Sequence, residues 1–153
     1  MGFFSFLKKK DFFTPSEKER IVQVIRLAEQ KTSGEIRVYV ESRNPFVDPL
    51  QRAKELFFKQ QMEQTRHRNA VLLYLALKHK EMALYGDEGI HNAVEDSYWN
   101  DTVKKMTHEF KKGDVTAAIV RCVQEIGNAL KEKFPFDNRN DKDELSDSVM
   151  IGE

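Results

Sequence analysis

Hydrophobic positions along the chain follow two different periods, and their order predicts an α/β fold. In the helical segments, apolar residues recur three or four positions apart, which buries one face of each helix. These segments are 15–33, 49–57, 94–111 and 114–134. In the strand segments, apolar residues alternate with polar ones or run without interruption. These segments are 36–40, 70–77 and 81–85. The order predicts a three-layer α/β/α sandwich around a small mixed sheet.

Residues that cap helices mark several of these boundaries. Thr14 precedes Pro15, and Glu17 stands at the third helical position, which together form a capping box with proline in the first turn. Asp48 and Asp114 occupy the same capping position before two later helices. The helices are therefore predicted to begin at or just after residues 15, 49 and 115.

The lengths of the connections predict how the strands pair. A helix separates the first two strands, so they should be parallel with a right-handed crossover. Only residues 78–80 separate the second and third strands, and so short a connection joins antiparallel neighbours. The end of the third strand should then lie beside the beginnings of the other two. This places residues 86–89 near 68–69 and near 32–35.

Oxygen donors are frequent among the residues that this topology brings together. Asp87, Glu88 and Asp96 carry carboxylates, and Asn69 and Glu35 lie before or at the start of the neighbouring strands. Hard cations such as Ca²⁺ and Mg²⁺ need several oxygen ligands at once. We therefore take these five residues as candidate metal ligands. The alternative is that the acids before a helix only cap it and compensate its dipole.

Two other constellations have weaker chemical meaning. Asp87, His91 and Glu95 are spaced four residues apart, so on one helix they would share a face and could bind a transition metal. The His-Glu-x-x-His pattern is absent, and a lone helical histidine beside acids is usually a salt-bridge partner. Cys122 lies on the apolar stripe of the last helix, which favours a core residue over a nucleophile.

The two ends of the chain differ from the middle. Residues 1–13 are aromatic-rich and irregular, 14–134 form the α/β domain, and 135–153 are polar without periodicity. The first segment is expected to pack on the domain, to rest on a membrane surface or to dock a protein partner. The last is expected to be a mobile tail. Its apolar Leu145, Val149 and Ile151 allow the alternative that its end docks as an edge strand.

Composition narrows the function classes further. The 153 residues include 25 Lys plus Arg and 25 Asp plus Glu, and this balance argues against a nucleic-acid partner. The single cysteine excludes an internal disulfide and a cysteine-based zinc site. No apolar run approaches the length of a transmembrane helix, so we expect a cytoplasmic protein. We also expect it to be a monomer. Glycine-rich phosphate loops, a nucleophile elbow and a cysteine phosphatase loop are all absent.

Several local strings, in their order and spacing, resemble the TPM domain family, also called the TPM phosphatase domain. Besides Trp99, these strings are 14–17, 33–38, 68–73, 86–90 and 110–114. The similarity covers about residues 12–134. It implies an α/β/α sandwich with a polar cleft near the loop after the third strand. Asp87, Glu88 and Asp96 match positions of the family's loop and following helix.

The resemblance implies three alternative functions. Family members are associated with divalent-cation binding, with phosphatase activity and, in plants, with photosystem repair. The first hypothesis is binding of Ca²⁺ or Mg²⁺ as the cofactor at the acidic loop. The second is a metal-assisted phosphatase in which Arg68 holds the phosphate, with no catalytic residue identified. The third is a non-catalytic protein-interaction module.

Overall fold

The computed structural model describes residues 12–45, 48–136 and 149–151, and it confirms the α/β fold. The first half contains α2 (Pro15–Glu29), β1 (Glu35–Glu41), α3 (Pro49–Lys59), β2 (Ala70–Ala76) and β3 (Glu81–Gly86). The second half contains α4 (Glu88–Ala93), α5 (Asp96–Lys111), α6 (Val115–Lys133) and the short strand β4 (Val149–Ile151). Residues 1–11 of the amino-terminal segment and residues 137–148 of the expected mobile tail lie outside the described residues. The predictions for these two segments therefore stay predictions.

The sheet has the strand order β3-β2-β1-β4. β1 and β2 are parallel, with Glu35 opposite Ala70, and β3 is antiparallel to β2, with Gly86 opposite Val71. These pairings confirm the predicted directions. β4 lies parallel to β1 at the other edge, with Val149 opposite Val38. The end of the chain thus forms an edge strand, the alternative that its apolar residues allowed.

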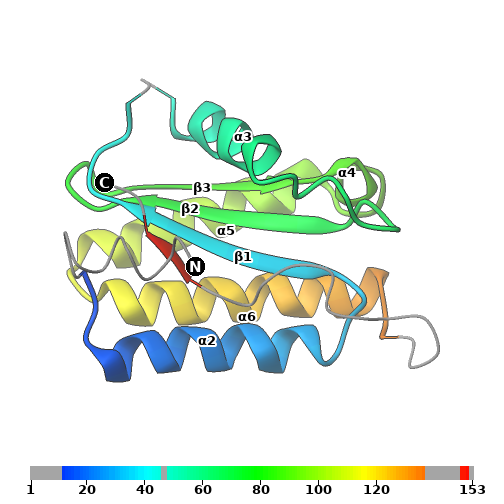
Figure 1. Cartoon of the computed structure of the whole chain (residues 1–153), viewed down its shortest axis with the longest axis horizontal. Helices are drawn as coiled ribbons and strands as arrows, with labels where there is room; N and C mark the ends of the chain where they lie inside the picture. Colours follow the sequence, from blue (N-terminus) through cyan, green and yellow to red (C-terminus); the bar gives the residue numbers. More distant parts are fainter. Residues whose placement is uncertain (1–11, 46–47, 137–148, 152–153) are drawn as a thin grey trace.

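Helices cover both faces of the sheet (Figure 1). α3 lies on one face, where Leu56 and Phe57 pack with Leu72 and Tyr74 of β2. The larger core lies on the opposite face, where α2, α5 and α6 pack against each other and the sheet. β2 supplies side chains to both cores and is buried along its whole length, as its unbroken apolar sequence predicts.

The predicted caps are present. The Thr14 side chain accepts a hydrogen bond from the Glu17 amide, and Glu17 accepts one from the Thr14 amide. Asp48 and Asp114 accept from Leu50 and Ala117 respectively. Each cap satisfies an amide that the first helical turn leaves without a partner, so local sequence determines where these helices begin.

One helix was not predicted. The short helix α4 follows β3 directly, and the chain turns extended at Val94 before α5 begins. Asp87 precedes α4, His91 lies within it and Glu95 is the residue before α5. The hypothesis that these three share one helical face is therefore wrong, because the break at Val94 separates Glu95 from the other two.

None of the helices in the described part of the chain combines the length and the apolar character needed to span a bilayer. The boundaries of the three predicted segments and the compartment stay predictions.

Candidate functional site

Three chain segments meet at the edge of the sheet where β1 and β2 begin and β3 ends. The Asp87 amide donates to the Ala70 carbonyl at 3.0 Å, and the Gly89 amide donates to the Arg68 carbonyl at 2.9 Å. Asn69 Nδ2 donates to Ser33 Oγ at 3.1 Å. The residues predicted to converge from the order and direction of the strands therefore lie together. We call residues 32–35, 68–70 and 86–89 the acidic rim.

The central contact of the acidic rim is an ion pair between Arg68 and Asp87. The Arg68 guanidinium donates from Nε to Asp87 Oδ2 at 2.6 Å and from Nη2 to Oδ1 at 2.8 Å. Its Nη1 donates to Glu88 Oε1 at 3.2 Å. The hydrogen bond to Asp87, followed by the nearby negative charges, raises the pKa of Arg68 above its ordinary value. One guanidinium thus holds two adjacent carboxylates.

Burial differs strongly across this contact. Asp87 is 2% exposed, whereas the Arg68 side chain is 35% and the Glu88 side chain 68% exposed. Asp87 also caps α4, since its Oδ1 accepts from the Glu88 amide at 2.8 Å. A buried carboxylate is therefore covered from outside by a side chain that solvent can reach.

The backbone around Arg68 is closely packed. Arg68 adopts a left-handed conformation with φ of 50°, which non-glycine residues seldom do. Gly89 passes so close that a Cβ there would lie 2.4 Å from the His67 carbonyl oxygen and 2.6 Å from that of Arg68. Glycine at residue 89 therefore allows the loop after β3 to approach the segment before β2.

Glu63 is a further acid near this site that sequence reasoning missed. Its negative charge acts on Arg68 together with those of Asp87 and Glu88. Its Oε2 atom is buried and has no hydrogen-bond partner among the described residues. Glu63 follows α3 in a segment without periodicity, so no sequence pattern places it near Arg68. Three carboxylates and one guanidinium leave a net negative charge here.

The other candidate ligands have different surroundings. Asn69 is fully buried, and its Oδ1 has no hydrogen-bond donor among the described residues. Glu35 is buried in the first position of β1, beside Ala70. Asp96 lies on the surface at the start of α5, and its Oδ1 is 3.6 Å from His91 Nδ1. The structure thus groups Asp87 with Glu88, and places Asp96 with His91.

These acids do not form a preformed metal centre. Within the described ranges, no three His, Cys, Asp or Glu side chains are arranged to hold a metal ion. Asp87 uses both carboxylate oxygens on Arg68. The residue types fit a hard cation, but Arg68 occupies both oxygens of Asp87 in this arrangement.

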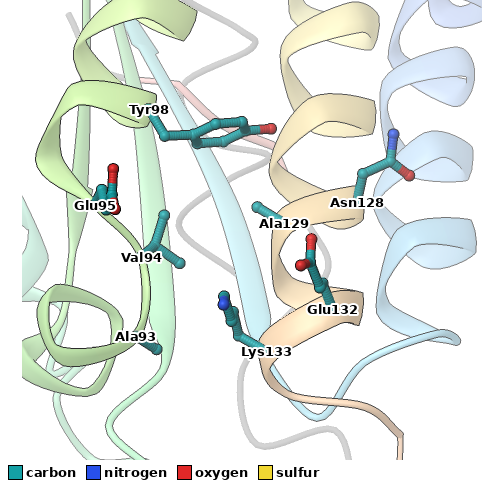
Figure 2. A pocket seen from close by; sticks show the side chains of 8 residues that line it. All are labelled: Ala93, Val94, Glu95, Tyr98, Asn128, Ala129, Glu132 and Lys133. Carbon is teal, nitrogen blue, oxygen red and sulfur yellow. The ribbon is translucent and has the colours of Figure 1, made fainter.

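A groove of about 370 Å³ lies between the beginning of α5 and the end of α6 (Figure 2). The Tyr98 ring bridges the two helices, and its hydroxyl is within hydrogen-bond distance of the Glu125 carbonyl and carboxylate, at 3.1 and 3.2 Å. Burial, followed by the charge of Glu125, raises the pKa of the Tyr98 phenol. Glu132 and Lys133 give the groove charges of both signs. These contacts link α5 to α6.

Cys122 is buried in the core between the helices, as its place on the apolar stripe predicts. Burial raises the pKa of its thiol to about 12. The nucleophilic thiolate is therefore scarce at neutral pH, which argues against a catalytic cysteine.

The fold described above is that of a TPM domain. The family model described as TPM domain matches residues 7–129, and the chain belongs to this family. A comparison with the curated proteins gives no match.

Solved structures support the same fold. The chain is similar to the BA42 protein of the psychrophilic bacterium Bizionia argentinensis, with 36% identity and a TM-score of 0.85 over 94% of this chain and 97% of that one. It also resembles the N-terminal domain of a P. gingivalis protein, with 15% identity and a TM-score of 0.64 over 81% and 80% of the chains. A third similar structure is the N-terminal domain of the cg2496 protein from Corynebacterium glutamicum. It has 15% sequence identity and a TM-score of 0.57 over 78% of this chain and 74% of that one.

Proposed function

We propose that this TPM domain binds a divalent cation, Ca²⁺ or Mg²⁺, at the acidic rim. The observation that carries the proposal is the convergence of the Asp87 and Glu88 carboxylates on a single guanidinium. These carboxylates carry two negative charges, and Arg68 supplies one positive charge. A divalent cation would balance both carboxylate charges.

The proposed binding is an exchange of one cation for another. Arg68 leaves Asp87, and the cation takes oxygen ligands from Asp87 and Glu88. Glu63 and Asn69 are further candidates, because each has a buried oxygen without a hydrogen-bond partner among the described residues. Glu35 and Asp96 stay predicted ligands from the sequence. The Glu88 side chain is exposed and that of Arg68 partly exposed, so both have room to move once a cation replaces the guanidinium as the counter-charge of Asp87. The backbone of the acidic rim stays fixed by its hydrogen bonds.

Titration of the full-length chain with CaCl₂ and with MgCl₂, followed by amide NMR and calorimetry, tests this proposal. We expect saturable shifts at residues 86–96 and at Arg68. Asp87→Asn should weaken binding at least about tenfold, because it removes a charged ligand from the site. Arg68→Gln should strengthen binding, since the competing guanidinium is gone.

Glu19 provides a matched control, because it is an exposed acid on α2. Glu19→Gln changes the net charge by the same amount as Asp87→Asn and should leave the affinity unchanged. Equal weakening by both variants would show diffuse attraction of the cation and would contradict a site at the acidic rim. An unchanged affinity in Arg68→Gln would contradict the exchange.

Phosphate-ester hydrolysis is a second candidate, favoured by one feature of the same contact. Once released from Asp87, the Arg68 guanidinium is a ligand for phosphate, and a bound cation polarises a phosphoryl oxygen. Hydrolysis of p-nitrophenyl phosphate in MgCl₂ that disappears in Asp87→Asn would support it. Cation binding without turnover would leave the first function and remove the second.

A further inference from the structure

β3 forms one edge of the sheet, and half of its backbone groups point away from β2. The Asp87 amide bonds to the carbonyl of Ala70, its partner in the antiparallel register. Hydrogen-bonded and non-hydrogen-bonded pairs alternate in such a ladder. The backbone N–H and C=O groups of Tyr85 and Ala83 therefore point toward β2. The backbone N–H and C=O groups of Met82 and Leu84 point outward, away from the sheet. No strand of the described residues pairs with this side of β3.

A groove of about 310 Å³ runs along this edge. Met82 and Leu84 contribute to its floor, Leu50 of α3 lines it on one side, and Trp99 and Val103 of α5 line it on the other. α3 and α5 lie on opposite faces of the sheet (Figure 1). The outward backbone groups therefore lie between two helical walls.

Two details of the groove indicate an occupant. Leu50 is 48% exposed, one of the few large apolar side chains of the described residues that is not covered. Trp99 is 8% exposed, yet its indole nitrogen is a buried donor without an acceptor among the described residues. From Met82 to Tyr85 the edge also lacks the charged residues and prolines that usually prevent an edge strand from pairing.

We propose that the β3 edge binds an extended peptide segment of another protein, which adds to the sheet as an antiparallel or parallel strand. Backbone hydrogen bonds to Met82 and Leu84 provide affinity, and the alternate side chains of the peptide contact the two walls. The chemistry of the walls selects aliphatic side chains on both faces of the peptide, toward Leu50 on one and toward Trp99 and Val103 on the other. This function goes beyond cation binding and does not depend on it.

A lone strand fits this edge better than a second copy of the chain does. A second copy would present its own β3 with α3 and α5 on either side. Because Leu50 of α3 and Trp99 and Val103 of α5 flank β3, we expect the helices of two copies to crowd each other at the roughly 4.8 Å spacing of paired strands. A peptide without covering helices enters the groove unhindered.

The test begins with selection of short random peptides, displayed on phage, against the immobilised full-length chain. The best binder is synthesised and titrated into the ¹⁵N-labelled chain. We expect amide shifts at residues 82–86 and a shift of the Trp99 indole N–H. Methylation of the peptide amides that point toward β3 should abolish binding, whereas methylation of the other set should leave it nearly unchanged, because only one edge of a strand pairs with the sheet.

Leu50→Glu and Leu27→Glu form a matched pair, because these leucines are 48% and 47% exposed and lie on α3 and α2. We expect Leu50→Glu to weaken the peptide about tenfold or more through loss of an apolar contact, and Leu27→Glu to have no effect. Failure to select any binder, shifts away from β3, or equal effects of the two methylated peptides would overturn the proposal. So would dimerisation through β3 that the peptide cannot displace in sedimentation velocity.

Discussion

The guanidinium of Arg68 binds both carboxylate oxygens of Asp87, at 2.6 and 2.8 Å, across the edge of the sheet where β2 begins and β3 ends. Asp87 is buried and Arg68 is partly exposed, so the arginine neutralises a charge that the fold has already removed from water. The pair joins two segments that are nineteen residues apart. The pair is therefore expected to stabilise the acidic rim.

Arg68→Gln is expected to destabilise the domain in the absence of divalent cations, because it leaves the Asp87 carboxylate buried without its counter-ion. Arg121→Gln removes a guanidinium from Glu109 on the surface, where the arginine side chain is 60% exposed, and is expected to change stability little. Urea unfolding compares the two. An equal loss in both variants would mean that the burial of Asp87 has no energetic consequence.

The buried group of Glu41, Arg52 and Tyr74 is expected to be a major source of stability on the α3 side of the sheet. Glu41 accepts from Tyr74 Oη at 2.5 Å and from Arg52 Nε and Nη2 at 2.8 and 2.9 Å. Burial, followed by the bond to Glu41, raises the pKa of Tyr74, so the phenol stays protonated and donates. Tyr74→Phe should cost about 2 kcal/mol and Glu41→Ala about 3 kcal/mol in urea unfolding.

In this group, the double variant distinguishes a shared network from independent contacts. If Tyr74 acts through Glu41, adding Tyr74→Phe to Glu41→Ala should cost almost nothing more. Simple addition of the two losses would contradict that interpretation.

Gly89→Ala is expected to distort the acidic rim, because the added Cβ would lie 2.4 Å from the His67 carbonyl oxygen. The carbonyl oxygens nearest to the new Cβ, those of His67 and Arg68, belong to the backbone and cannot rotate away as a side chain could. We therefore expect the free energy of unfolding to fall by about 3 kcal/mol. Gly113→Ala provides the contrast: no atom lies within 4 Å of the new Cβ, but φ is +112°. Its cost should be about 1–2 kcal/mol, from backbone strain alone. Thermal unfolding measures both, and the reverse order would contradict this account.

The capping box of α2 is expected to weaken in acid. The Thr14 amide, followed by the Thr116 hydroxyl, lowers the pKa of Glu17 below 4.5 in the folded chain. A lowered folded-state pKa stabilises the protein above the unfolded-state value, and the stabilisation is lost as pH falls through the folded-state pKa. The difference in stability between the wild type and Glu17→Gln should therefore shrink below pH 4.5.

Two other variants serve as comparisons in this pH experiment. Thr14→Ala should cost about 1 kcal/mol at neutral pH, because the cap is lost. Glu19→Gln, also on α2 but outside the box, should show no such dependence on pH. If the difference in stability between the wild type and Glu17→Gln stayed constant from neutral pH to acid, the ionised carboxylate would be excluded as the stabilising species.

The sequence predicts the acidic rim because strand direction follows from connection length. The helix between β1 and β2 and the short turn after β2 are enough to bring Asp87 beside Asn69 and Ser33. α4 escaped prediction because its six residues are too few to show a period. The partnership of Arg68 with Asp87 and the approach of Glu63 also escaped it, because side-chain contacts across the sheet leave no local pattern.

The turn of β2 into β3 has a consequence far from its own position. Four residues, 77–80, separate the paired positions Ala76 and Glu81. Successive side chains of a strand point to opposite faces, so one inserted residue that shifted β3 along β2 would turn its outward side chains inward. Asp87 would then project into the wrong layer of the sandwich, out of reach of Arg68. The length of a turn that contains no acidic residue thus determines on which face of the sheet the charged side chains at its opposite end lie.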